Sequence, residues 1–137
     1  MSRMLINNDV LEKDLVRCSR KRIYPGLEIE FRRILRLLNE DNQLPGEHPM
    51  RGFDGDSSNR IWHAYINLPH LNLSRREGAR IVYYRYNLTA EVKVLYVGGH
   101  RDSVYNDERF LTELIKSRAT ILDGGFISYE GYLQRDL

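Results

Sequence analysis

The stretch 78-GARIVYYRYNLTAEVKVLYVGGHRDSVY-105 decides the fold of this chain. Two runs within it, 80–86 and 92–97, are dense in Val, Ile, Leu and Tyr, and the residues between them are polar enough to turn. Two such runs on either side of a turn predict a β-hairpin. The second run is apolar on both sides after Lys93, which is typical of a central strand.

The second run ends at Gly98 and Gly99, and three ionisable residues follow at once: His100, Arg101 and Asp102. A rigid strand that ends in polar side chains is a common way for a scaffold to present chemistry. We therefore expect the functional site at this end of the hairpin.

Length and composition indicate one globular domain over residues 1–137, in which 119–137 form a C-terminal extension whose structure the sequence does not decide. The chain has 42% hydrophobic and 29% charged residues, which is ordinary for a globular protein. No run approaches the ~20 apolar residues of a membrane span, and no secretory signal is apparent. With a single cysteine, these features predict a cytoplasmic protein.

The single cysteine, Cys18, has two interpretations. Its neighbours Arg17 and Arg20 could activate the thiol. Its spacing from Leu11 and Leu15 instead favours a small residue of the core.

The basic residues are predominantly arginine. Net charge is only +2, but 17 of the 21 basic residues are arginine. A guanidinium grips phosphate or carboxylate through two parallel hydrogen bonds, whereas lysine is a point charge. This balance favours partners that carry phosphate or carboxylate groups.

The N-terminal part predicts two amphipathic helices. The first follows the polar residues 7–9 and ends among the cations 20–22, and the second runs from 27 to about 38 after the break at 24–26. Each has one apolar face, so the pair predicts a helical hairpin. The apolar positions are Leu11, Leu15, Cys18, Leu27, Phe31, Ile34 and Leu38.

The remainder predicts a loop over 39–59, a strand over 60–67, a second loop and a helix from about 107 to 118 with Phe110, Leu111, Leu114 and Ile115 on one face. Acidic residues at 54–58 lack the ligand spacing of a calcium loop, so we expect a solvated turn there. The order of elements predicts an α+β domain, an antiparallel sheet with its helices on one face.

Two motifs carry a family resemblance. Residues 78–84, GARIVYY, and 97–105, VGGHRDSVY, resemble conserved segments of the RelE/ParE superfamily, the toxins of type II toxin-antitoxin systems. The resemblance covers roughly residues 9–118. It implies an N-terminal helical hairpin packed on a curved antiparallel sheet of about four strands, with a short C-terminal helix.

The RelE-like resemblance implies a metal-independent endoribonuclease that cleaves mRNA on the ribosome, without a cofactor, and that is neutralised by a cognate antitoxin protein. A homodimer or a toxin-antitoxin hetero-oligomer would be the expected assembly. Attack by the 2′-hydroxyl needs proton transfer, for which histidine is suited, and stabilisation of phosphorane charge, for which arginine is suited. The implied catalytic residues are Arg80, His100, Arg101, Tyr105 and His63. The implied RNA-binding residues are Arg60, Arg75, Arg76 and Tyr65, and no metal site is expected.

Each candidate also has a structural interpretation. Arg80 could pair with Glu77 or Glu91, the 100–101 pair could cap the sheet edge, and Tyr105 or His63 could belong to the core. His48 and His70 are weaker candidates.

Two other functions remain open on the same fold. A ParE-like toxin would bind and inhibit DNA gyrase without cleaving RNA, and an inactive binding module would do neither.

Overall fold

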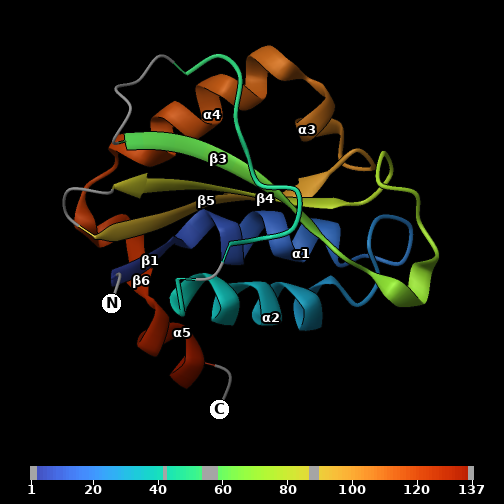
Figure 1. The fold of residues 1–137 in the computed structure, drawn as a ribbon, viewed down its shortest axis with the longest axis horizontal. Coiled ribbons are helices and arrows are strands. Elements are labelled where there is room, and N and C mark those ends of the chain that lie inside the picture. The colour runs from blue at the N-terminus through green and yellow to red at the C-terminus, as the bar shows by residue number, and fades with distance from the viewer. Residues whose placement is uncertain (1–2, 42, 54–58, 87–89, 136–137) are drawn as a thin grey trace.

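Figure 1 shows the fold in a computed structural model, which describes residues 3–41, 43–53, 59–86 and 90–135. Within these residues, one sheet of six strands has the order β2-β3-β4-β5-β1-β6. The α+β class is therefore confirmed. The strands are β1 (Arg3–Asn7), β2 (His48–Pro49), β3 (Asn59–Ile66), β4 (Ala79–Tyr86), β5 (Glu91–Gly99) and β6 (Phe126–Ser128).

The helices connect and flank these strands. A π-helical turn over Val10–Asp14 leads directly into α1, and the helix predicted to reach residues 20–22 ends at Cys18. The second predicted helix is confirmed as α2. The helices are α1 (Leu15–Cys18), α2 (Leu27–Asn39), α3 (Ser103–Asn106), α4 (Glu108–Thr120) and α5 (Tyr129–Arg135). No helix of the described ranges has the length and apolar character needed to cross a membrane.

The predicted hairpin is confirmed as the antiparallel pair β4 and β5, in which Ala79 lies opposite Gly99 and Tyr86 opposite Glu91. The turn expected at 87–89 lies outside the described residues. A register shift leaves Leu95 as an extra residue, because Val82 pairs with Tyr96 and Tyr83 with Val94. Such a β-bulge re-aims the side chains that follow it. Tyr96 consequently packs on the α4 side of the sheet.

The prediction of an all-antiparallel sheet of four strands was wrong. β1 pairs in parallel with β5, β6 adds to β1, and β2 adds to β3. The N-terminal strand is only five residues long, and Met4, Leu5 and Ile6 are all buried. A strand that is covered on both faces lacks the alternation of polar and apolar residues by which a strand is predicted. The short apolar run of β1 was therefore interpreted as the segment that leads into the first helix.

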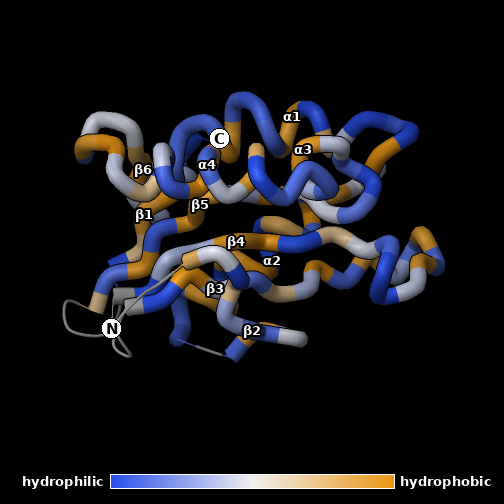
Figure 2. Tube along the Cα trace, turned by 90° about the horizontal axis from the view of Figure 1, so that it is seen from above, coloured by the Kyte–Doolittle hydropathy of each residue, from blue (hydrophilic) through white to orange (hydrophobic). Residues whose placement is uncertain are grey.

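The helices lie on both faces of the sheet, which corrects the prediction of one covered face (Figure 1). Figure 2, seen from above, shows the sheet extending from β2 at the bottom through β3 and β4 to β6 at the upper left. Side chains of α1, α2 and α5 pack on one face. On the other face, Leu111 and Ile115 of α4 pack against Ile61, Val82 and Leu95. Phe110, expected on the buried stripe of α4, is 52% exposed.

The loop predicted over 39–59 contains β2, which pairs His48 with His63. The region 54–58, considered above as a calcium-like loop, lies outside the described residues. The C-terminal extension is ordered by its aromatic residues: Tyr129 and Tyr132 are buried, and the Tyr132 ring meets Phe31 edge-on at 6.3 Å between centroids. Tyr129 and Tyr132 thus complete the core on the α1 and α2 face, whereas Phe126 packs on the α4 side.

Candidate functional site

Strand alternation brings the predicted site residues of β3 and β4 to the face that α4 covers in part. His63 and Tyr65 share this face with Ile61, and Arg80 lies directly opposite Tyr65 across the strand pair. Arg60 has the opposite parity and shares its face with Trp62. The structure therefore brings His63, Tyr65 and Arg80 together and places Arg60 on the other side of the sheet.

Arg80 is held at the floor of this region. Its guanidinium carbon lies 4.1 Å from the centroid of the Tyr65 ring, and only 5% of the residue is exposed. Nη1 donates to the carbonyl of Ala79 at 3.0 Å, and Nη2 donates to the carbonyl of Arg75. The charge of Arg80 is thus fixed in place by the aromatic ring and by two backbone carbonyls.

The two acids considered as partners of Arg80 pair with other cations. Glu77 lies 3.9 Å from Arg101, and Glu91 lies 3.9 Å from Arg3 and from Lys93. Within the described residues, Arg80 therefore forms no ion pair with either of these acids.

Tyr105 belongs to α3, which follows the end of β5, and its side chain lies next to Arg80. Its ring stacks on Tyr96 at 6.0 Å and meets the His100 ring edge-on at 5.0 Å. Burial raises the pKa of the Tyr105 phenol above its ordinary value, and the neighbouring Arg80 guanidinium opposes part of that rise. Tyr105 is consequently a neutral phenol at physiological pH, able to donate a hydrogen bond.

His63 lies between these groups and β2. Burial is the main cause that lowers the pKa of His63 below its ordinary value, and the neighbouring His48 and the Arg80 guanidinium lower it further. Its ring centroid is 6.0 Å from that of His48. The buried Nδ1 of His63 has no hydrogen-bond partner among the described residues. A neutral imidazole with an unsatisfied nitrogen can accept a proton.

A cleft of about 530 Å³ opens beside His63 and Tyr105. One wall of this cleft is β2, which was not predicted from the sequence because it is two residues long and the Pro and Gly residues around it indicate a loop. His48 was treated as a weak candidate for the same reason. The residues that line the cleft are His48, Pro49, Met50, Arg51, His63, Tyr105, Glu108 and Thr112.

Asp102 fixes the position of α3 and was not among the predicted site residues. Its buried carboxylate accepts two hydrogen bonds from Arg17, at 3.0 and 2.8 Å, and one from the Tyr96 hydroxyl. It also accepts a hydrogen bond from the backbone N–H of Val104, which makes it the N-cap of α3. Burial alone would raise the pKa of Asp102, but the bonds from Arg17 and Tyr96 hold it below its ordinary value.

The double glycine before His100 follows from this packing. A Cβ on Gly98 would lie 1.9 Å from the Tyr96 hydroxyl oxygen and 2.8 Å from an Asp102 carboxylate oxygen. Gly99 has a φ of 144°, and a Cβ there would lie 2.6 Å from the Tyr24 hydroxyl. The glycines allow Asp102 and Tyr24 to approach the strand end closely.

A second buried acid, Asp14, lies one helical turn before Arg17. Arg118 of α4 donates to both of its oxygens and to the carbonyl of Leu95, and Arg17 lies 3.4 Å away. Burial raises the pKa of Asp14, against the opposing effect of Arg118. We call Asp14, Arg17, Tyr96, Asp102 and Arg118 the buried ion network. Its members come from four segments that are distant in sequence, so no local pattern predicts the network.

The remaining predicted residues lie around the strand end. Arg101 turns toward the connection between α1 and α2, where its Nη1 donates to the carbonyl of Ile23 at 3.3 Å. The Arg75 guanidinium carbon lies 5.6 Å from the Tyr65 ring centroid, and Arg76 is exposed in the same turn. Hence Arg75 adjoins Tyr65 and Arg80, while Arg101 contacts Ile23 and Glu77. The functional roles of all these residues stay predictions.

Cys18 is a core residue. It is fully buried, with Sγ 3.9 Å from the carbonyl oxygen of Val97, and burial raises the pKa of its thiol to about 12. A thiol that stays protonated is a poor nucleophile, so the interpretation as an activated thiol is not supported.

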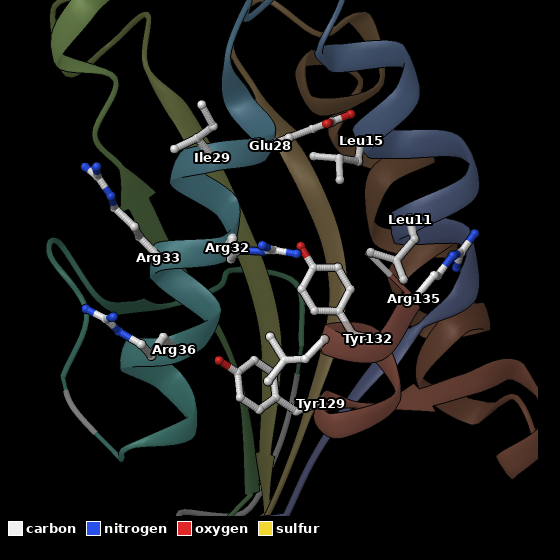
Figure 3. Close-up of a pocket in the computed structure, with 11 residues that line it drawn as sticks. Leu11, Leu15, Glu28, Ile29, Arg32, Arg33, Arg36, Tyr129, Tyr132 and Arg135 are labelled. Atoms are coloured by element: carbon white, nitrogen blue, oxygen red, sulfur yellow. The ribbon is translucent and has the colours of Figure 1, made fainter. Parts of the chain in front are cut away.

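A separate groove of about 640 Å³ runs between α1, α2 and α5 on the far face of the sheet (Figure 3). Its lining combines apolar side chains with arginines. Ile29, which is 63% exposed, and Leu133 lie among Arg32, Arg33, Arg36 and Arg135. This groove is a second surface on which a ligand or partner could lie.

Within the ranges that the structure describes, no three His, Cys, Asp or Glu side chains are placed to hold a metal ion together. Comparison of the chain with known protein families, with curated proteins and with solved structures finds no match in any of the three.

Proposed function

We propose that this protein is a RelE-like toxin, an endoribonuclease that cleaves mRNA by attack of the RNA 2′-oxygen in the cleft beside His63 and Tyr105. One observation carries the proposal: His63, Tyr65, Arg80, His100 and Tyr105, from β3, β4 and the segment after β5, converge on one side of the sheet. The two sequence motifs that resemble the RelE/ParE superfamily contribute three of these five residues.

The reaction assigned to the cleft transfers two protons and exchanges one bond at phosphorus. The RNA 2′-hydroxyl loses its proton to the neutral His63 imidazole, and the 2′-oxygen attacks the adjacent phosphorus. The bond to the 5′-oxygen breaks, and the Tyr105 phenol donates a proton to that oxygen as it leaves. The products are a 2′,3′-cyclic phosphate and a 5′-hydroxyl end. The depressed pKa of His63 and the elevated pKa of Tyr105 give the two residues opposite roles.

Arg80 supplies the positive charge that the reaction needs. The attack concentrates negative charge on the phosphate oxygens, and a fixed cation next to Tyr105, which lines the cleft, stabilises that charge without reorganising. Its two hydrogen bonds to backbone carbonyls hold the guanidinium in place beside the Tyr105 phenol.

Aromatic rings around Arg80 provide places for bases to stack. Tyr65 and Tyr105 are half-buried, and His100 is exposed beside Tyr105. Stacking on such rings contributes about 1–3 kcal/mol per base in proteins that bind single strands. This arrangement supports a single-stranded segment of RNA as the substrate.

A second candidate is a ParE-like toxin that binds DNA gyrase without cleaving RNA. The buried position of Arg80 favours it, because both terminal nitrogens already donate to the backbone and only 5% of the residue is exposed. An arginine with a purely structural role would look the same.

Mapping the ends of mRNA in a translating extract separates the two candidates. Wild-type protein is expected to cut the message, and Tyr105→Phe and His63→Gln are expected to lower the rate of cutting by a factor on the order of 10²–10⁴. Lys116→Ser, an exposed position on α4, is the matched control and should cut at the wild-type rate. Intact mRNA together with inhibited supercoiling by gyrase would support the second candidate instead.

A toxin also requires a neutralising partner. The groove in Figure 3 supports a cognate antitoxin protein, because an acidic amphipathic segment could lay apolar side chains on Ile29 and Leu133 and carboxylates beside the arginines around them.

A further inference from the structure

Exposed basic residues gather at one edge of the molecule. They come from three segments that are far apart in the sequence: the connection between α1 and α2, the turn before β4 and the end of β5, which meet at the right of Figure 1. We call this set the basic edge. Its members are Arg20, Lys21, Arg22, Arg75, Arg76 and Arg101.

Hydrogen bonds through Tyr24 fix the three segments to one another. The Tyr24 hydroxyl donates to the carbonyls of Glu77 and Gly78, at 2.7 and 2.9 Å, and accepts from the backbone N–H of Arg101 at 3.1 Å. The His70 ring nitrogen lies 2.7 Å from the carbonyl oxygen of Pro25. The basic edge is therefore a built surface rather than a chance meeting of loops.

Little negative charge offsets the basic edge. Glu77 is its acidic neighbour, and it lies 3.9 Å from Arg101. Within the described residues, no ion pair involves Arg20, Lys21, Arg22 or Arg76. Four cations without a carboxylate partner create a positive potential that attracts polyanions.

A chain of contacts links the basic edge to the cleft: Arg75 adjoins Tyr65 and Arg80, and Arg80 adjoins Tyr105, which lines the cleft. The Arg75 guanidinium lies over the Tyr65 ring, and its carbonyl accepts the hydrogen bond from Arg80. A strand whose phosphate lies at Arg80 would pass Arg75 before it reaches Arg20, Lys21 and Arg22.

The composition of the basic edge suits phosphate rather than a protein partner. Protein interfaces have an apolar core, but the large apolar residues that the described part of the chain exposes lie on α1, α2, α4, α5 or just after α4. Surfaces that bind single strands instead combine a positively charged track with aromatic rings, and here the track leads to Tyr65 and Tyr105.

We propose that the basic edge binds the backbone phosphates of the single-stranded RNA that leads out of the cleft, with residues 20–22 as the far end of the binding track. This inference rests on the proposed function, because it extends the substrate of the same cleft. It adds a part of the chain, the connection between the first two helices, to which the sequence motifs assign no RNA contact.

The test measures binding of a 2′-O-methyl oligonucleotide of about 12 nucleotides, a length within the range that single-strand-binding surfaces cover. The 2′-O-methyl group blocks cleavage by 2′-attack, so binding is measured alone. Fluorescence anisotropy is recorded between about 50 and 200 mM salt for wild type and for the triple variant Arg20→Ser, Lys21→Ser, Arg22→Ser. Loss of three phosphate contacts should reduce the slope of log K against log salt by about 2 and weaken binding about tenfold or more at the lowest salt.

The matched control is Arg33→Ser, Arg36→Ser, Arg135→Ser, which removes the same charge from the groove in Figure 3. It should keep the wild-type slope. Equal losses of affinity in the two triple variants would show that only net charge matters, and would overturn the proposal. A wild-type salt slope in the 20–22 variant would overturn it as well.

The failure of this inference can be told apart from that of the proposed function. If the 20–22 variant binds like wild type while Tyr105→Phe still abolishes cleavage, the cleft reaction stands and the basic edge is not part of it. If wild-type protein neither binds the oligonucleotide nor cuts mRNA, both proposals are wrong.

Discussion

The buried ion network and the cleft place similar side chains on either side of Tyr96, but they satisfy them differently. In the network, Arg118 and Arg17 meet both oxygens of Asp14 and of Asp102, and Tyr96 donates to Asp102 as well. In the cleft, the buried Nδ1 of His63 has no partner within the described residues. Both carboxylates of the network are paired at each oxygen, which fixes their structure, although Arg118 Nε, like His63 Nδ1, has no hydrogen-bond partner among the described residues.

The two regions are also mechanically connected. Asp102 ends the network and begins α3, the short helix that carries Tyr105 into the cleft. The network therefore positions the cleft without taking part in it. This division predicts that substitutions in the network mainly lower the free energy of unfolding, whereas substitutions in the cleft mainly lower the rate of RNA cleavage.

The largest effect is expected from Asp14→Ala, which leaves Arg118 buried without its carboxylate. Removal of one partner of a buried ion pair destabilises a protein by about 3–5 kcal/mol. Urea unfolding followed by circular dichroism measures this change. The double variant Asp14→Leu, Arg118→Met should recover most of the loss, because it removes both charges and keeps the volume; if it stays as unstable as the single variant, the ion pair is not the cause.

The next effect concerns the cleft. Tyr105→Phe removes the proton donor and keeps the ring that stacks on Tyr96, so mRNA cleavage should fall by about 10² or more while the melting temperature changes little. A quench-flow or gel assay of cleavage on the same preparation used for melting checks both values. Equal loss of activity and stability would place Tyr105 in the core instead.

An intermediate effect is expected from Asp102→Asn, which keeps the shape of the N-cap and removes the charge that pairs with Arg17. Hydrogen bonds to charged groups contribute about 1.5–3 kcal/mol, so stability at pH 7 should fall by that order. The folded pKa of Asp102 is depressed, so its contribution is present above the unfolded value and is lost as pH falls through the folded value. The gap in stability between wild type and variant should therefore begin to narrow as pH falls below about 3.8 and should close below the folded pKa; a constant gap would contradict this.

A smaller effect should follow pH through His63. The folded pKa of His63 lies below the ordinary value of 6.5. As pH falls below 6.5, the unfolded chain therefore binds a proton at this residue before the folded protein does, and the free energy of unfolding decreases. This uptake costs at most about 1.4 kcal/mol per pH unit, down to the folded pKa. Unfolding midpoints at successive pH values should decline in wild type and decline less in His63→Gln. Besides burial, His48 and Arg80 lower the pKa of His63. The variant His48→Gln is therefore the control that measures how much His48 contributes to the pH dependence.

The smallest effect is expected on α2, where the exposed Arg33 pairs with the partly buried Glu30 at 3.1 Å. Arg33→Ser should change the free energy of unfolding by no more than about 0.5 kcal/mol, because solvent screens such pairs. A loss near that of Asp14→Ala would show that burial does not separate the two kinds of ion pair in this protein.

The hairpin, α2, β3 and α4 could be predicted from sequence, because each has a clear period and turn residues at its ends. β1 could not, because a strand buried on both faces has no alternation. β2 could not, because its two residues include Pro49 and owe their pairing to His63 and Trp62. The faces of the helices were misjudged because the side of the sheet that α4 covers depends on long-range packing.

The site was predictable in part for a similar reason. Arg80, His100 and Tyr105 follow from two local motifs, and Tyr65 from strand alternation. The direction of Arg101 depends on Ile23 and Glu77, and the cap formed by Asp102 depends on Arg17, all distant in sequence. Local patterns placed residues at the strand end, but only tertiary contacts decide which of them point into the cleft.

The central claim is that the cleft promotes attack by the RNA's own 2′-oxygen. Its most direct test is cleavage of a message that carries a single 2′-deoxynucleotide immediately before the mapped scission, measured beside the all-ribose message. The account predicts that the all-ribose message is cut to a 2′,3′-cyclic phosphate and a 5′-hydroxyl end, and that the 2′-deoxy message stays intact at that position. Cleavage of both messages at the same rate would contradict it.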